Sequence, residues 1–227
     1  MRRVEEGDFS LDKNRHALLL LGEELKMPLV SILQVAELTN ADATIGAHAS
    51  KALKTIDNML LYQRIHSGQT ALRLEPVHIG STIQEVAHGI EPLMRAAGCR
   101  TELHIQHGLS TVDADRRLLS AALYSLWQAF IDAVDSGGDI VCRANRTKQG
   151  IRVSLQSASV LLDNLRLSHM RTDSSQPITA LAGASTDLYT AREMFVLLGG
   201  RLNKTTGATR TGLGVTLPVS RQLSLVS

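Results

Sequence analysis

Two apolar repeats near the start of the chain restrict its fold more than any other feature. The first repeat spaces its apolar residues alternately by three and four, which is typical of a helix that buries one stripe, and comprises Leu18, Leu21, Leu25, Pro28, Ile32 and Val35. A second repeat follows the polar stretch TNADAT and comprises Ile45, Ala49, Ala52, Ile56 and Met59. Two helices joined by a short turn form an antiparallel hairpin, and a lone hairpin leaves apolar surface wet. We therefore expect two copies to pair into a four-helix bundle.

Composition excludes several classes of protein. The 227 residues suit one large or two small domains, and a net charge of +2 with scattered basic residues does not require a polyanionic partner. Aromatic residues make up only 3%, which argues against nucleic-acid binding by base stacking. Cys99 and Cys142 form no CxxC motif, so we expect neither a metal site nor a disulfide framework.

Apolar runs are too short for a membrane span, and the first residues lack the apolar stretch of a signal peptide. We expect a cytoplasmic protein, or the soluble piece of a longer receptor, without direct membrane insertion.

From about residue 72 the pattern predicts an α/β domain. Helices are expected at 79–98, 115–134 and 187–198, the last ending at Gly199 and Gly200. Strands are expected at 100–106, at 139–145 and 151–157 as a hairpin, and at 201–205 and 213–219. Helices on one face of a mixed sheet would give a two-layer α/β sandwich. The predicted fold class is therefore α+β, with a helical hairpin at 11–68 and a sandwich domain at 72–221.

Four motifs, in this order, resemble those of one protein family. They are EELKMPL (23–29), MLLYQRIHSG (59–68), VDADRRLLSAALYSLWQA (112–129) and REMFVLLGGRL (192–202) with the closing TLP. Together they resemble the catalytic core of a sensor histidine kinase. That resemblance implies a dimerisation and phosphotransfer hairpin followed by an ATPase-type domain of the gyrase, Hsp90 and histidine kinase superfamily.

The hairpin motif departs from the family at one residue. The family carries H-E-L-[RK]-x-P-L on the helix, and Glu23 stands where the histidine accepts the phosphoryl group. Within the first repeat Glu23 takes the position most remote from the seam, so we expect it to be fully available to a partner. The resemblance implies that the partner-binding residues are Glu23, Glu24, Lys26, Met27, Pro28 and Leu29.

The nucleotide motifs depart from the family as well. Ser125 and Ala129 replace the two asparagines of the long helix, and Ala129 has no oxygen to offer magnesium. In the acidic and glycine-rich turns of the family, Ser157 replaces the aspartate that receives adenine, and Ser159, Ser185 and Asp187 replace glycines. We therefore expect no nucleotide cofactor and no metal.

Plainer interpretations of these residues remain open. Asp187 is a good N-cap for the helix it starts, and Glu23 is also compatible with an ordinary solvated helix position or with a designed change from histidine. His16 lies one heptad before Glu23 but lacks the flanking acid and proline of a phosphoacceptor.

Two hypotheses of function follow. The first is a catalytically inactive, dimeric histidine-kinase-like adaptor, a pseudokinase of two-component signalling that binds a response-regulator receiver domain or another histidine kinase. The alternative is a histidine phosphotransfer protein that uses another histidine, such as His16, beside a vestigial ATP domain. A third, weaker interpretation keeps an active kinase with divergent motifs, which nucleotide binding would distinguish from the other two.

Overall fold

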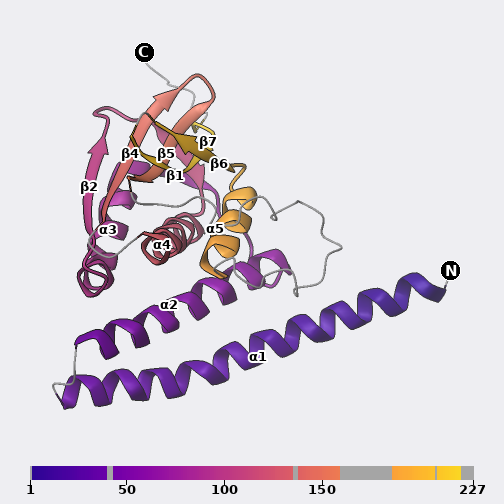
Figure 1. Cartoon of the computed structure of the whole chain (residues 1–227). Helices are drawn as coiled ribbons and strands as arrows, with labels where there is room; N and C mark the ends of the chain where they lie inside the picture. Colours follow the sequence, from indigo (N-terminus) through magenta and orange to yellow (C-terminus); the bar gives the residue numbers. More distant parts are fainter. Residues whose placement is uncertain (1, 40–42, 135–137, 159–185, 208, 221–227) are drawn as a thin grey trace. The chain divides into compact units, whose positions relative to one another are not determined.

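The structure is a computed structural model, and it describes residues 2–39, 43–134, 138–158, 186–207 and 209–220. The chain divides into two compact units, Met1–Ala71 and Leu72–Ser227. Among the described residues, the first unit holds two helices and the second holds the strands (Figure 1).

The first unit is a helical hairpin of α1 (Arg2–Leu38) and α2 (Ala43–His66), which pack against each other. Small residues bring the helices together, because a Cβ added to Gly22 would lie 2.7 Å from Leu60 Cδ2. Leu19 and Ala36 of α1 and Ala49 of α2 are also buried. The side of α1 that carries Leu19, Gly22 and Ala36 is therefore its buried side.

The repeat that the sequence suggested as the seam of α1 is instead largely exposed. Leu21, Leu25, Ile32 and Val35 are between 45% and 59% exposed. They lie about one residue, or 100° of helix, away from the buried stripe of Leu19, Gly22 and Ala36. We call the exposed set of Leu21, Leu25, Pro28, Ile32 and Val35 the outer stripe.

The second unit contains a two-stranded and a five-stranded sheet. In the small sheet β1 (Glu75–His78) pairs with β3 (Thr111–Ala114). The large sheet has the order β2-β4-β5-β7-β6 and consists of β2 (Arg100–Ile105), β4 (Asp139–Thr147), β5 (Gly150–Ser157), β7 (Thr211–Leu217) and β6 (Arg201–Thr206). Only the pairing of β2 with β4 is parallel among these described strands, so the sheet is mixed.

Three helices lie on one side of the large sheet: α3 (Ile79–Ala96), α4 (Arg116–Ala133) and α5 (Thr186–Leu197) (Figure 1). Alternate strand residues point toward them and form the core, including Ala144, Val153, Leu155, Leu213 and Val215. From the helices, Trp127, Phe130 and Phe195 fill the same core. Both cysteines are buried, and burial raises the pKa of the Cys142 thiol to about 12.

The α+β class and the mixed sheet predicted from the sequence are confirmed. The expected hairpin is the antiparallel pair β4 and β5, and α5 ends where Gly199 takes a positive φ of 74°. The sequence analysis missed β1 and β3, which are four residues each and pair across a long separation. The predicted helix at 79–98 ends at Ala96, and Pro92 lies inside it.

Candidate functional site

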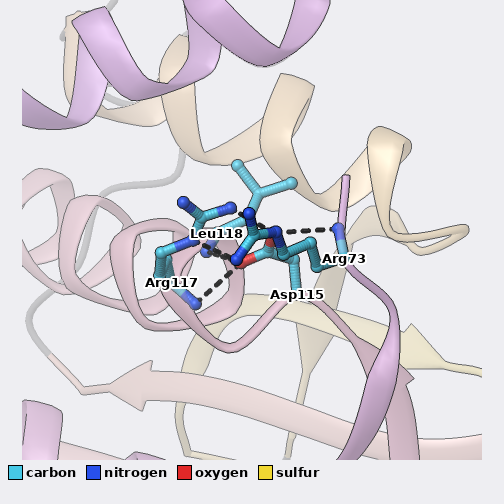
Figure 2. Close-up of polar contacts among 4 residues, drawn as sticks. All are labelled: Arg73, Asp115, Arg117 and Leu118. Carbon is cyan, nitrogen blue, oxygen red and sulfur yellow. Dashed lines mark hydrogen bonds and ion pairs between the residues drawn. The ribbon is translucent and has the colours of Figure 1, made fainter. Parts of the chain in front are cut away.

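Helix α4 carries two of the positions that the sequence analysis singled out, and a buried carboxylate fixes its start. Asp115 is the N-cap of α4 and accepts hydrogen bonds from the backbone N–H groups of Arg117 (3.0 Å), Leu118 (3.4 Å) and Arg73 (3.1 Å) (Figure 2). The Arg117 side chain adds bonds from Nε (3.2 Å) and Nη2 (2.8 Å). Because Arg73 opens the second unit, Asp115 ties that entry segment to the first turn of α4.

Burial and hydrogen bonding act in opposite directions on the Asp115 carboxyl. Burial raises its pKa, and the hydrogen bonds from Arg117, Arg73 and Leu118, helped by the charge of Arg117, lower it by more. The net result is a pKa below the ordinary value, so the group is ionised at neutral pH.

One face of α4 carries the two positions that the sequence resemblance matched to asparagines of the family. Ser125 and Ala129 lie one turn apart, and both are almost completely buried. Ala129 presents only a methyl group, so it offers no ligand to a hard cation.

Ser157 and Asp187 are two further buried polar positions of the second unit. Ser157 ends β5 and is buried, and Asp187 is buried in the first turn of α5. The helix begins at Thr186, so Asp187 is a first-turn residue rather than the N-cap that the sequence suggested. Burial, followed by the negative charge of Asp187, raises the pKa of Tyr124 on α4.

The remaining two positions, Ser159 and Ser185, lie outside the described residues. Among the residues that are described, no group of three or more His, Cys, Asp or Glu side chains could hold a metal ion. The described part of this site therefore supplies one buried carboxylate and two buried serines, next to a methyl group.

The sequence analysis missed one polar side chain on the same helix. Gln128 adjoins Ala129 in the chain and is fully buried, and neither of its side-chain amide atoms has a hydrogen-bond partner. The indole N–H of Trp127 is also buried without a partner. A buried amide without partners is costly, so Gln128 is an unusual choice for this position. A motif comparison would not have found Gln128, because only its burial in the structure marks this residue as unusual.

The second candidate site surrounds Glu23 on the hairpin. The Arg64 Nη2 of α2 donates to Glu23 Oε1, and Lys26 Nζ lies 3.4 Å from Glu23 Oε2 and 2.8 Å from Asp57 Oδ1. These four residues form a charge cluster of zero net charge, which we call the hairpin cluster. The pKa of Lys26 is raised, first by its hydrogen bond to Asp57.

This geometry corrects the expectation that Glu23 is fully available. Its side chain is 43% exposed and is paired with the second helix. The expectation assumed that the outer stripe faced α2, whereas α2 contacts the neighbouring side of α1. Of the other predicted partner-binding residues, Glu24, Met27 and Pro28 are exposed, and Lys26 and Leu29 are half-buried.

Comparison with known proteins gives a class for this fold. The sequence matches no family model, and a search of curated proteins finds no match. Solved structures do match, and they show that the chain has the fold of a sensor histidine kinase catalytic core.

Three of these structures illustrate the range of the match. The catalytic domain of histidine kinase ThkA has a TM-score of 0.52 at 18% identity, with 64% of this chain and 95% of that chain covered. A histidine kinase from Burkholderia phymatum STM815 also has a TM-score of 0.52 at 18% identity. The match covers 97% of this chain and 99% of that chain. Full-length ShkA in complex with AMPPNP reaches 0.59 at 19% identity, with 90% of this chain but 46% of ShkA covered.

None of the described helices is long and apolar enough to cross a membrane.

Proposed function

We propose that this chain is a catalytically inactive histidine-kinase-like adaptor of two-component signalling. It acts in the cytoplasm and binds a response-regulator receiver domain, or another histidine kinase, through its hairpin. The observation that carries the proposal is the state of Glu23. The residue at the phosphoacceptor position has no imidazole nitrogen, and Arg64 and Lys26 already engage its carboxylate.

A binding surface remains beside this cluster. Met27 lies one helical turn after Glu23 on the same side of α1 and is 71% exposed. Glu24, about one helical turn before Met27, is exposed as well. A large exposed apolar side chain bordered by polar groups is suited to the centre of a protein contact.

The second unit supports the inactive part of the proposal. Nucleotide-dependent phosphoryl transfer needs a magnesium ion and close approach of backbone to phosphate. Ala129 offers no oxygen, and Asp187 adds a negative charge beside a ligand that is itself negative. The residues present do not fit a magnesium nucleotide, so we assign no cofactor and derive no reaction step.

The outer stripe supports a homodimer through the hairpin. Its apolar residues are exposed in the single chain, and they repeat at the three and four spacing of a coiled-coil seam. Pairing two copies along this stripe would bury it in a four-helix bundle. Met27 lies one residue, about 100° of helix, from Pro28 of the outer stripe, so Met27 would lie beside the dimer seam rather than in it.

The proposal is tested by binding and by labelling. The full chain is immobilised, and purified receiver domains and kinase cores of the source cell are passed over it one at a time. We expect saturable binding of at least one of them, and Met27→Asp should weaken it about tenfold by placing a charge in an apolar contact.

The matched control is Val196→Asp, because Val196 is an exposed apolar residue of α5, outside the hairpin. Equal loss in both variants, or no binding by any domain, contradicts the adaptor role. Incorporation of radiolabel from ATP by the unmodified chain contradicts the inactive role.

A further inference from the structure

Charge is distributed unevenly over the large sheet. The segments 139–157 and 201–217, which contain β4, β5, β6 and β7, hold one carboxylate, Asp139, and a formal charge of +6 in a chain of +2. Their seven cations are Arg143, Arg146, Lys148, Arg152, Arg201, Lys204 and Arg210. A near-neutral protein therefore carries a local excess of positive charge in this part of the sheet and its turns.

The strand register places three of these arginines on the face away from the helices. Arg152 of β5 pairs with Thr216 of β7, which pairs with Arg201 of β6, so both arginines point the same way. Asn145 of β4 lies opposite Arg152, and Arg143 comes two residues earlier on the same face. We call the face that carries Arg143, Arg152 and Arg201 the open face.

Part of the open face is accessible to a partner, although Val141 and Ser154 on the same face are buried. Arg143 and Arg201 are exposed, as are Asn145 and Asn203 beside them. Strand β7 contributes two glycines in the middle of this face, Gly212 and Gly214, which pair with open-face residues of β5 and β6. Without side chains there, the Arg152 guanidinium reaches across β7 and donates to Thr205 Oγ1 of β6 at 2.7 Å.

These arginines are not neutralised within the described part of the chain. No described carboxylate lies within ion-pair distance of Arg143, Arg152 or Arg201. On the neighbouring strand β2 the cation Arg100 does have a partner, since its Nε lies 3.4 Å from Asp139 Oδ1. The three arginines without a described carboxylate partner thus lie on β4, β5 and β6.

The residue types on these strands indicate which kind of partner the open face can bind. Strands β4 to β7 contain no aromatic residue on which a nucleobase could stack, and none of the exposed large hydrophobic residues lies on them. Such a surface is poorly suited to binding single-stranded nucleic acid or to inserting into a membrane. Guanidinium groups bind carboxylates through two parallel hydrogen bonds, which favours an acidic polypeptide.

We propose that the open face docks an acidic, extended segment of a partner protein. Arg143 and Arg152 are diagonal neighbours on adjacent strands, which corresponds to about 7–8 Å. An extended peptide repeats its side chains on one face about every 6.8 Å, so acidic residues at alternate positions match this spacing. The inference goes beyond the adaptor role, because it concerns a different unit from the hairpin and requires no contact with Glu23 or Met27.

The test uses the full chain and a fluorescein-labelled peptide of alternating Glu and Gly, with binding followed by fluorescence anisotropy at low and at physiological salt. The test variant combines Arg143→Gln with Arg201→Gln. The control combines Arg95→Gln on α3 with Lys204→Gln, which also lies on β6 but points to the other side of the sheet, opposite Leu213. Both double variants lose the same net charge.

We expect saturable, salt-sensitive binding of the peptide, about tenfold weaker for the test variant and changed less than twofold for the control. Thermal unfolding of both variants checks that they fold. Equal weakening by the two variants would mean attraction by net charge alone and would overturn the proposal. So would the absence of binding, or tighter binding of an oligo-uridylate or of phosphatidylserine vesicles than of the peptide. None of these outcomes depends on the hairpin, so failure here leaves the adaptor role intact.

Discussion

The carboxylate of Glu23 on α1 is paired with the guanidinium of Arg64 on α2, so the residue that we propose takes the phosphoacceptor position is bound by its own hairpin. Lys26 engages the other carboxylate oxygen and also contacts Asp57. The hairpin cluster is thereby close to neutral, and its two cations are occupied. The negative charge of Glu23 is therefore largely compensated, so it repels an acidic pocket of a partner only weakly.

This pairing predicts the effect of neutralising Glu23. Glu23→Gln leaves the positive charges of Arg64 and Lys26 less compensated, so an acidic receiver pocket should bind more tightly, by about threefold to fivefold at low salt and less at high salt. Surface plasmon resonance with the receiver found in the binding screen measures the change. Glu23→Gln combined with Arg64→Gln is the control and should bind like the unmodified chain. Unchanged affinity in every variant, with Glu23→Ala and Glu23→His included, would show that this position does not contribute.

The outer stripe predicts a dimer that one charge can break. Leu25→Asp places a carboxylate in the apolar seam of the bundle, where it would be buried without a partner, so the variant should be monomeric or aggregated. Light scattering at micromolar concentration reports the mass, and the exposed Val196→Asp variant should keep the dimer mass. A monomeric mass for the unmodified chain would refute the bundle.

Asp115 predicts an acid-dependent loss of stability in the second unit. Its folded pKa is depressed, so its stabilisation is present at pH values above the ordinary carboxyl pKa of about 3.9 and is lost as pH falls through the lower folded value. Asp115→Ala should cost about 1–2 kcal/mol at pH 7, as the loss of an N-cap does. Denaturant unfolding between pH 7 and pH 3 measures both effects.

Asp115→Asn separates the cap from the charge. Asparagine still accepts from the Arg117 and Leu118 backbone, but it does not titrate, so this variant should lose less stability and should show a weaker acid dependence. If Asp115→Ala and unmodified protein lose stability in parallel below pH 4, the carboxylate is not the source of the dependence.

Local pattern was enough to predict most elements of the second unit. Helix α3 buries residues at the expected spacing, with Ile79, Ile83, Val86 and Ile90 all buried, and the β4–β5 hairpin follows from alternation within one short stretch. Strands β1 and β3 could not be predicted in the same way. Each has four residues, and Glu75 pairs with Ala114, so their formation depends on tertiary contacts rather than on local preference.

The candidate sites were harder to predict because their contacts join distant residues. Glu23 and Arg64 are 41 residues apart, and their contact depends on which side of α1 faces α2. The apolar residues of the outer stripe suggested one side, whereas Gly22 and Leu60 approach closely on another. Gln128 belongs to no sequence motif. Its unusual feature is a buried side-chain amide without hydrogen-bond partners, which only the structure reveals.

Gln128 itself predicts a stabilising substitution. Gln128→Leu removes a buried amide without partners and keeps a side chain of similar size, so the free energy of unfolding should rise by about 1 kcal/mol. Gln128→Glu is the opposing control and should destabilise, since it buries a charge. Thermal and denaturant unfolding compare the variants. A clear loss of stability in Gln128→Leu would show that the amide contacts a polar group in solution and is satisfied there.

The last prediction concerns nucleotide and the alternative use of His16. A ligand present at 100 times its dissociation constant adds about 2.7 kcal/mol of stability, which a thermal shift readily detects. Ala129 has no oxygen to ligate magnesium, and at the proposed phosphate position the charge of Asp187 would be repulsive, so millimolar Mg-ADP should leave the melting temperature unchanged. For the same reason Glu23→His should take up no label from ATP, because restoring the acceptor does not restore the nucleotide site. Incubation with a phosphorylated receiver, followed by mass spectrometry, tests the phosphotransfer alternative separately. Phosphate on His16 would support that alternative, whereas a saturable thermal shift with Mg-ADP would contradict the inactive assignment of the second unit.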